Sequence, residues 1–217
     1  MTGLLLTTTK NVVASIYYLN CSRRGCTVNR WLFDQFNAFA RATPWLHGPA
    51  VAYAQYGVVA FVVLLLAGWW IARRSGRVAG VAAAISAGGA TLLAVAVNQP
   101  IVHAVHEARP YTTLPGILVL ANRSTDPSFP SDHATMAGAV AAGLWIVNRR
   151  LGIVAAAAAV LMAASRVYIA AHYPGDVVAG LLLGAIVAIG TWLLVRRVLT
   201  WCVEAIAGTR LRVVLLS

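Results

Sequence analysis

Three short polar motifs interrupt a chain that is otherwise strongly apolar. The first is Arg109-Pro110 and the second is Ser131-Asp132-His133. The third joins Ser165-Arg166 to His172 and then to Asp176, four residues further along. Arginines bind phosphate oxygens through charge-assisted hydrogen bonds, and histidines transfer protons or attack phosphorus near neutral pH. Two arginines, two histidines and the start of a helix therefore predict phosphate chemistry.

The spacing of His172 and Asp176 suits a nucleophile and the group that orients it. Pro174 is well placed as the first residue of a helix, which puts Asp176 in the first turn. A carboxylate there can accept a hydrogen bond from the protonated ring nitrogen of His172 and leave the other nitrogen free to attack phosphorus. His133 is suited to protonate the departing oxygen. The alternative for His172 is a histidine near the lipid headgroups that only tolerates water. The alternative for His133 is a helix cap or a packing residue.

Arg109, Arg166 and Ser131 are candidates for holding the phosphate. The two guanidinium groups would bind the equatorial oxygens, where a phosphoryl-transfer site must stabilise negative charge. Ser131 and the backbone N–H groups that follow it would form an anion site at a helix start. Either arginine could instead extend to the headgroups, and Ser131 could be an N-cap. Asp132 is harder to explain beside a phosphate, and it would orient an arginine or bind a hydroxyl group or water.

The charge balance argues against a metal cluster and against nucleic acid. The 217 residues include 17 Lys and Arg but only 6 Asp and Glu, so acidic metal ligands are few. We therefore expect a reaction without metal or cofactor. Arginine pairs follow the apolar segments, as charges that set membrane topology do, and no basic face of a soluble fold is visible. We expect no nucleic-acid partner.

Composition places the chain in a membrane. It is 60% hydrophobic and 11% charged, which excludes an ordinary soluble domain. Upstream of the apolar segments, Leu32, Phe36 and Phe39 recur at helical spacing after Arg30. We predict an all-α polytopic bundle of about five transmembrane helices with an N-terminal amphipathic helix at the bilayer surface. Each predicted span approaches the roughly 20 residues needed to cross a bilayer, and the five cover about residues 50–72, 78–103, 131–147, 151–168 and 174–195.

Arginine pairs predict how the chain is threaded. If every apolar segment crosses once, Arg73-Arg74, Arg149-Arg150 and Arg196-Arg197 lie on one side, which the positive-inside rule makes the cytoplasm. The loops at about 104–130 and 167–174 then share the outer face and bring the three motifs together. We assign residues 30–200 to one membrane-embedded domain, residues 1–29 to an extension without an assigned role, and residues 201–217 to a tail.

The three motifs resemble those of the type 2 phosphatidate phosphatase superfamily. The order is the same, and the third motif matches in residue type and spacing as Ser-Arg-x5-His-x3-Asp. The resemblance implies a phosphohistidine on His172, with His133 as the general acid. Within the superfamily the chain looks most like bacterial undecaprenyl-diphosphatases, which share Pro-Ser-Asp-His-Ala-Thr around Asp132 and a His-Tyr-Pro-x-Asp stretch.

That resemblance implies an activity and a location. We expect hydrolysis of an isoprenoid diphosphate to the monophosphate and phosphate, in a multi-pass protein of the bacterial inner membrane, among membrane lipids and with the site on the outer face. Another lipid phosphate, such as phosphatidate, phosphatidylglycerol phosphate or a prenyl-phosphosugar, is the nearest alternative. A non-catalytic scaffold or a transporter is the alternative from a different class.

One position departs from the family pattern. The first motif usually begins with a lysine seven residues before its arginine, and here that position is Val102. A diphosphate carries more negative charge than Arg109 and Arg166 neutralise, and unpaired buried charge is costly. Another cation should therefore approach the second phosphate. The candidates are Arg123, His103 and His106. Arg123, in the polar stretch before His133, is the first of them, and His106 is the next residue to test.

Overall fold

The structure is a computed structural model that describes residues 23–209. Within that range every regular element is helical, as the apolar segments predict. The predicted extension and tail fall partly outside the described residues, at 1–22 and 210–217. The elements are α2 (Arg23–Ala42), the short 3-10 helix η1 (Pro44–Leu46), α3 (His47–Tyr56), α4 (Val58–Arg74), α5 (Val78–Val105), α6 (Pro110–Thr113), α7 (Asp132–Val147), α8 (Arg149–Tyr168) and α9 (Pro174–Ala207).

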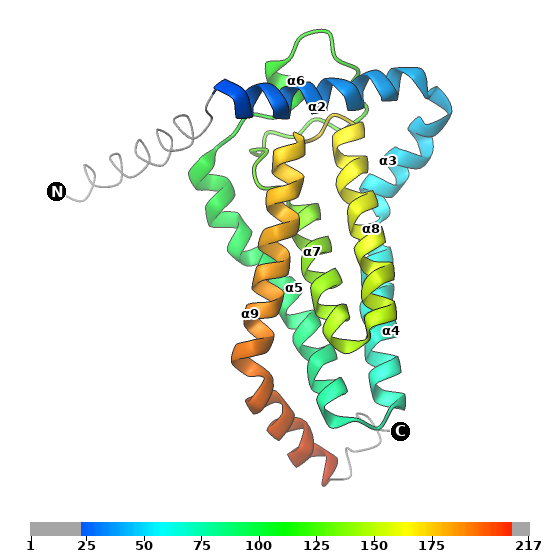
Figure 1. Ribbon diagram of the computed structural model, residues 1–217, viewed down its shortest axis with the longest axis vertical. Coiled ribbons are helices and arrows are strands. Elements are labelled where there is room, and N and C mark those ends of the chain that lie inside the picture. Colours follow the sequence, from blue (N-terminus) through cyan, green and yellow to red (C-terminus); the bar gives the residue numbers. More distant parts are fainter. Residues whose placement is uncertain (1–22, 210–217) are drawn as a thin grey trace, which may run out of the picture.

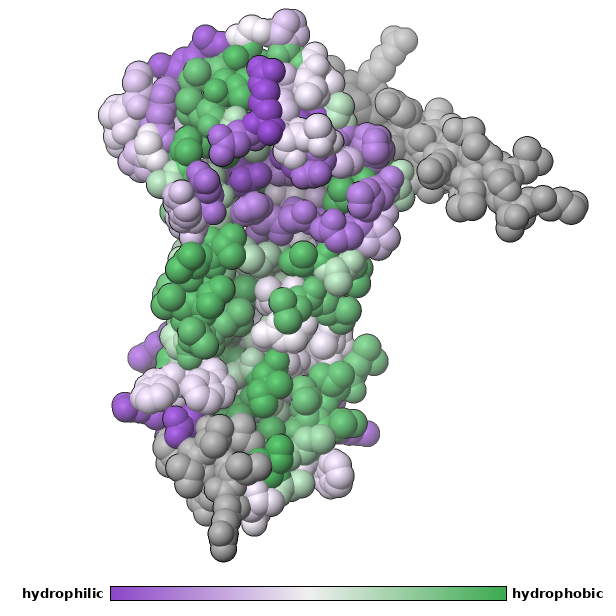
Figure 2. Space-filling view, turned by 180° about the vertical axis from the view of Figure 1, so that it is seen from behind, coloured by the Kyte–Doolittle hydropathy of each residue, from purple (hydrophilic) through white to green (hydrophobic). Residues whose placement is uncertain are grey.

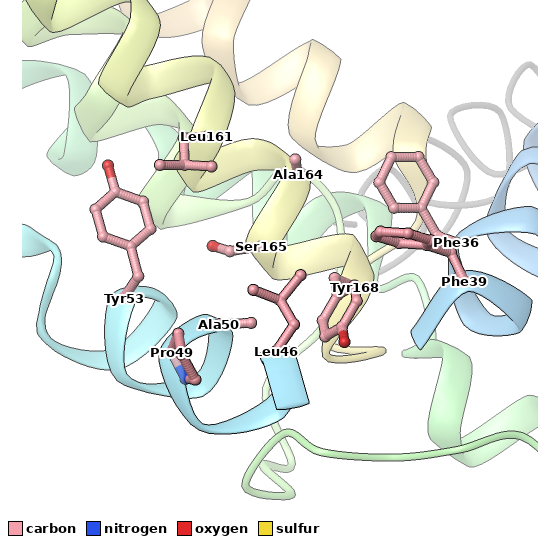
Figure 3. Close-up of a pocket in the computed structure, with 10 residues that line it drawn as sticks. All are labelled: Phe36, Phe39, Leu46, Pro49, Ala50, Tyr53, Leu161, Ala164, Ser165 and Tyr168. Atoms are coloured by element: carbon pink, nitrogen blue, oxygen red, sulfur yellow. The ribbon is translucent and has the colours of Figure 1, made fainter. Parts of the chain in front are cut away.

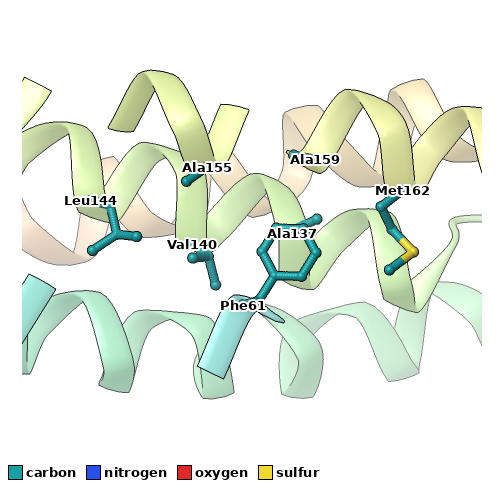
Figure 4. Packing of buried hydrophobic residues seen from close by; sticks show 7 residues of the cluster. All are labelled: Phe61, Ala137, Val140, Leu144, Ala155, Ala159 and Met162. Atoms are coloured by element: carbon teal, nitrogen blue, oxygen red, sulfur yellow. The ribbon is translucent and has the colours of Figure 1, made fainter. Parts of the chain in front are cut away.

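The long helices form a bundle around α7, and α2 crosses one end of it (Figure 1). α7 packs against α5, α8 and α9, so its neighbours separate it from the surroundings on most sides. The core between α4, α7 and α8 packs alanine and aliphatic side chains around one phenylalanine (Figure 4): Phe61, Ala137, Val140, Leu144, Ala155, Ala159 and Met162. Large apolar side chains on the outside form a belt around the bundle, whereas the end that carries α2 is mostly hydrophilic (Figure 2).

Glycines bring α7 and α9 into direct backbone contact. A Cβ atom at Gly184 of α9 would overlap the carbonyl oxygen of Thr135, and one at Gly138 of α7 would overlap the carbonyl oxygen of Leu181. Small residues allow helices in lipid to approach in this way, because van der Waals packing drives their association. The starts of α7 and α9 are therefore held side by side.

The predicted membrane bundle is confirmed, but its five segments differ in kind. α5, α8 and α9 are long and apolar enough to cross a membrane. The segment predicted at 50–72 is instead two helices, α3 and α4, bent by 54°. Gly57 lies at the bend, where a Cβ would come within 2.7 Å of Cε of Met162. α7 has 16 residues, about 24 Å of helix, which is shorter than a full span, and it lies inside the bundle against α5, α8 and α9.

Two predicted helix boundaries shift. α2 begins at Arg23 rather than Arg30, and α9 continues past Arg196-Arg197 to Ala207. α2 has two faces, as predicted, but its buried face is centred on Phe33, Asn37 and Ala40, whereas Leu32 and Phe39 are exposed. The reason is a specific contact: the Asn37 side chain donates to the carbonyl of Leu118 at 2.7 Å and accepts from its N–H at 3.1 Å. α2 therefore holds the loop before α7 in place through the hydrogen bonds between Asn37 and Leu118.

The close contact of α7 and α9 can be tested at one glycine. We expect Gly184→Ala to lower the thermal unfolding midpoint by several degrees, because overpacking a helix contact costs about 1–3 kcal/mol. Gly190→Ala, on the same helix with no atom within 4 Å of the added Cβ, is the control and should not lower the midpoint. Equal midpoints for the two detergent-solubilised variants would show that the backbones are not in contact.

Candidate active site

The three motifs meet at the end of the bundle that α2 covers (Figure 1). His172 lies in the loop between α8 and α9, and its Nε2 is 3.4 Å from Nη1 of Arg109 and 3.4 Å from Nη2 of Arg166. Arg109 is the residue before α6, and Arg166 is in the last turn of α8. Residues more than 60 positions apart in sequence thus converge on one imidazole nitrogen, as the predicted threading requires.

The hydrogen bond made by Nδ1 determines which tautomer His172 adopts. Nδ1 lies 2.8 Å from the backbone carbonyl oxygen of Ser128. A carbonyl only accepts hydrogen bonds, so Nδ1 must carry the proton and Nε2 keeps its lone pair. That lone pair faces the two guanidinium groups of Arg109 and Arg166, which is where a bound phosphate would be attacked.

Electrostatics keep His172 neutral. The side chain is buried, and burial is the largest cause that lowers its pKa well below the usual value. The positive charges of Arg166 and Arg109 lower the pKa further. An imidazole that is unprotonated at neutral pH can act as a nucleophile without first losing a proton.

Asp176 supports His172 less directly than the sequence predicts. Its Oδ2 is 3.5 Å from Nδ1, farther than the carbonyl oxygen of Ser128. The same Oδ2 accepts a short hydrogen bond from the Ser128 hydroxyl and another from the N–H of Tyr173 at 2.9 Å. The second bond caps the N-terminus of α9. Asp176 therefore holds the loop of His172 through Ser128 and Tyr173.

Backbone carbonyls fix both arginines. Arg109 donates from Nε to the carbonyl of Asp126 at 2.8 Å and from Nη1 to that of Ala171 at 3.3 Å. Arg166 donates from Nη1 to the carbonyl of Ala54 at 3.4 Å. Nη1 of Arg109 and Nη2 of Arg166 thereby lie beside Nε2 of His172. A phosphate between them would meet donors that are already oriented.

Ser131 occupies the N-cap position of α7, but its side chain makes no capping hydrogen bond. The hydroxyl is buried and has no hydrogen-bond partner in the part of the chain that the structure describes. Its N–H donates to the carbonyl of Asp176 at 3.1 Å, which joins the starts of α7 and α9. A buried hydroxyl at a helix N-terminus is suited to donate to a phosphate oxygen.

Asp132 is held by two amides. Its Oδ1 accepts hydrogen bonds from Asn98 at 2.6 Å and from Gln99 at 2.9 Å, both on α5. Asn98 also donates to the carbonyl of Pro130 at 3.2 Å. These amides orient the carboxylate. They also tie the start of α7 to α5. The role suggested by the sequence, that Asp132 orients an arginine or binds a hydroxyl group or water, stays a prediction.

A cavity of about 220 Å³ lies beside the cluster. Its polar lining comes from His133, Arg166, Gln55 and Asn122, and its apolar lining from Val51, Ala54, Leu120, Ala121 and Ile169. Arg123 follows Asn122 in the loop and is exposed, and His106 is exposed at the C-terminal end of α5. Val102 is buried within α5. The assignment of a second phosphate to Arg123 or His106 stays a prediction.

Sequence reasoning missed Ser128, which touches both His172 and Asp176. The only signal was its place three residues before Ser131, and a serine in a loop does not by itself indicate a role. Among the side chains of residues 28–209, no group of three or more His, Cys, Asp and Glu is arranged to hold a metal ion. The expectation of a reaction without metal stays a prediction.

Comparison with known proteins agrees with the motifs and the geometry. The sequence model of the PAP2 superfamily matches residues 83–199, which include all three motifs. Undecaprenyl-diphosphatase BcrC of Bacillus subtilis is 27% identical over 160 residues, covering 74% of this chain and 80% of the relative. The putative undecaprenyl-diphosphatase YbjG of Escherichia coli is 30% identical over 162 residues, covering 73% of this chain and 78% of the relative.

Solved structures share the fold. The crystal structure of Aquifex aeolicus LpxE superimposes with a TM-score of 0.58 at 24% identity, covering 76% of this chain and 95% of that protein. A PAP2-type phosphatidylglycerolphosphate phosphatase from Bacillus subtilis gives a TM-score of 0.54 at 20% identity, covering 90% and 96%. With the matched motifs and the membrane bundle, these similarities show that the chain belongs to the PAP2 superfamily and is a multi-pass membrane lipid phosphatase.

Proposed function

We propose that this protein removes the terminal phosphate from a polyprenyl diphosphate and leaves the polyprenyl monophosphate in the membrane. The observation that carries the proposal is that Nε2 of His172 bears no proton and faces the guanidinium groups of Arg109 and Arg166. The names of the relatives BcrC and YbjG support a diphosphate substrate.

His172 begins the proposed reaction. Its Nε2 attacks the terminal phosphorus, an N–P bond forms, and the bond from phosphorus to the bridging oxygen breaks. Arg109, Arg166 and Ser131 hold the oxygens, whose charge must be stabilised in the transition state. His133, which lines the cavity with Arg166, gives a proton to the departing monophosphate oxygen.

Water completes the proposed reaction. His133 has lost its proton in the first step, so it can accept one from a water molecule that attacks the phosphohistidine. An O–P bond forms, the N–P bond breaks, and phosphate leaves. His172 returns to its starting tautomer because its proton stays on Nδ1 throughout, hydrogen-bonded to the carbonyl oxygen of Ser128.

An apolar cavity supports a lipid substrate. It measures about 380 Å³ and lies between α2, α3 and α8 (Figure 3), where it is lined by Phe36, Phe39, Leu46, Pro49, Ala50, Tyr53, Leu161, Ala164, Ser165 and Tyr168. Its hydroxyl groups are already engaged: Tyr53 donates to the carbonyl of Ala158, Ser165 to that of Met162, and Tyr168 bonds Thr43. The cavity therefore favours a hydrocarbon chain. α3 and α8 also line the smaller cavity at Arg166.

Phosphate release from defined lipids tests the proposal. We expect the purified, detergent-solubilised protein to hydrolyse polyprenyl diphosphate with a higher kcat/KM than phosphatidate or phosphatidylglycerol phosphate. His172→Ala, as the control, should release no phosphate. A preference for phosphatidate or phosphatidylglycerol phosphate would overturn the substrate assignment, and no release from any lipid phosphate would contradict catalysis.

We also propose that the site faces the outside of the cell. The arginine pairs that end α4 and begin α8 lie at the end of the bundle opposite α2 (Figure 1), which supports a cytoplasmic position for that end. In a background without the native cysteines, Thr125→Cys should react with an impermeant thiol reagent in intact cells. Ser75→Cys should react only after the membrane is opened. The reverse pattern would place the site in the cytoplasm.

Arg123 is our candidate for binding the phosphate that is not transferred. Its neighbour Asn122 lines the cavity with His133 and Arg166. A lost charge-assisted contact of about 1.5–3 kcal/mol lowers kcat/KM roughly ten- to hundred-fold. We expect Arg123→Ala to show this loss on a polyprenyl diphosphate but a much smaller one on a monophosphate. Equal losses on both substrates, or none, would leave His106 as the next residue to test.

A further inference from the structure

A third cavity lies at the end of the bundle opposite α2, away from the candidate active site. It measures about 480 Å³ and lies between the start of α5 and the C-terminal part of α9. Its lining residues are Ala79, Trp192, Arg196, Arg197, Thr200, Trp201 and Glu204. None of them belongs to the three motifs or lines the two cavities described above. A ligand in this cavity would therefore be a different molecule from the proposed substrate.

Helix packing fixes the shape of this third cavity. The sequence predicts that α9 ends at Arg196-Arg197, whereas the helix continues to Ala207. Beyond the arginine pair, Val203 belongs to a buried cluster with Ala72 of α4 and Val81 of α5. These contacts hold the C-terminal part of α9 beside the start of α5. The arginine pair therefore lies within a packed helix and not in a loop.

The two guanidinium groups have no partner in the part of the chain that the structure describes. Neither Arg196 nor Arg197 forms an ion pair or a side-chain hydrogen bond with another described residue. Glu204 lines the same cavity, so two positive charges and one negative charge leave a net charge of +1. A phosphate diester carries one negative charge and would neutralise the cavity. Arginine binds phosphate oxygens with well-matched geometry, often through two parallel hydrogen bonds.

The third cavity lies at the depth of lipid headgroups. From Pro174, at the end that carries α2, to Arg196 the helix rises about 33 Å. The hydrocarbon core of a bilayer is roughly 30 Å thick. Trp192 lies one turn before Arg196 and Trp201 one turn after Arg197, and tryptophan is enriched at the membrane–water interface. Basic pockets between membrane helices at such a depth bind anionic headgroups.

We propose that the third cavity binds the headgroup of an anionic phospholipid, with Arg196 and Arg197 on the phosphate diester. The acyl chains then lie against the apolar surface of α9 on the membrane side of the arginines, where Leu193 and Leu194 are exposed. A free phosphate ion would gain nothing from that surface, so a lipid is the ligand. The site is independent of the proposed reaction, because the loop between α8 and α9 that carries His172 lies at the opposite end of the bundle (Figure 1).

Lipid retention by the full chain in detergent tests the proposal. Native mass spectrometry measures how much phosphatidylglycerol stays bound, with phosphatidylcholine as a lipid that has a phosphate diester but no net charge. We expect Arg196→Gln combined with Arg197→Gln to weaken phosphatidylglycerol binding about ten-fold or more, because two charge-assisted contacts are lost. Phosphatidylcholine should bind the wild type more weakly, and the double variant should change its binding less than about two-fold.

Arg149 and Arg150 provide a matched control at the same end of the bundle. Both are exposed, and neither lines the third cavity. Arg149→Gln combined with Arg150→Gln removes the same two charges and should leave phosphatidylglycerol binding within about two-fold of the wild type. Ala79→Phe is the complementary variant, because it fills the cavity and keeps both arginines. It should also weaken phosphatidylglycerol binding several-fold.

Three results would overturn the proposal. Equal losses in the two double arginine variants would show that the lipid responds to the general positive charge of this end and not to the cavity. Unchanged binding without Arg196 and Arg197 would exclude these arginines as ligands of the phosphate. Displacement of the lipid by inorganic phosphate would show that a phosphate ion is the ligand. Lipid held at the active site is the same in every variant, so the differences report on the third cavity.

Discussion

The hydrogen bond from Nδ1 of His172 to the carbonyl of Ser128 is the interaction on which the site depends. It sets the tautomer, and the tautomer decides that the nitrogen facing Arg109 and Arg166 is the one with a lone pair. A buried imidazole surrounded by guanidinium groups is costly when protonated. The same environment that makes the ring neutral also makes the space beside it favourable for a phosphate. The proposed nucleophile and the proposed anion site therefore share one physical cause.

Helix packing brings the groups to that point. The glycine contacts between α7 and α9 allow the N–H of Ser131 to reach the carbonyl of Asp176 at 3.1 Å, so two helix starts are joined below the loops. Asn37 of α2 then fixes the loop at Leu118 from the other side. Hydrogen bonds to backbone groups therefore hold the helix starts and the loop together at this end of the bundle. This arrangement suits a reaction on lipid headgroups at the bilayer surface.

Sequence reasoning succeeded where one physical rule dominated. Apolar segment length and arginine pairs were enough to predict that Arg109, His133 and Arg166 lie at the same end of a helical bundle. It failed where the decisive atom was in the backbone, because the carbonyl of Ser128 has no signature in residue type. The bend at Gly57 and the burial of Phe33 instead of Leu32 also depend on contacts with distant helices. Periodicity along one helix does not contain that information.

The central claim is that His172 becomes covalently phosphorylated. Wild-type protein mixed with a polyprenyl diphosphate labelled with ³²P in the terminal phosphate, and quenched during turnover in alkaline detergent, tests it most directly. We expect label on the peptide that contains His172, stable in base and lost in acid. Phosphate release without labelled protein, or label on a different residue, would contradict nucleophilic attack by His172.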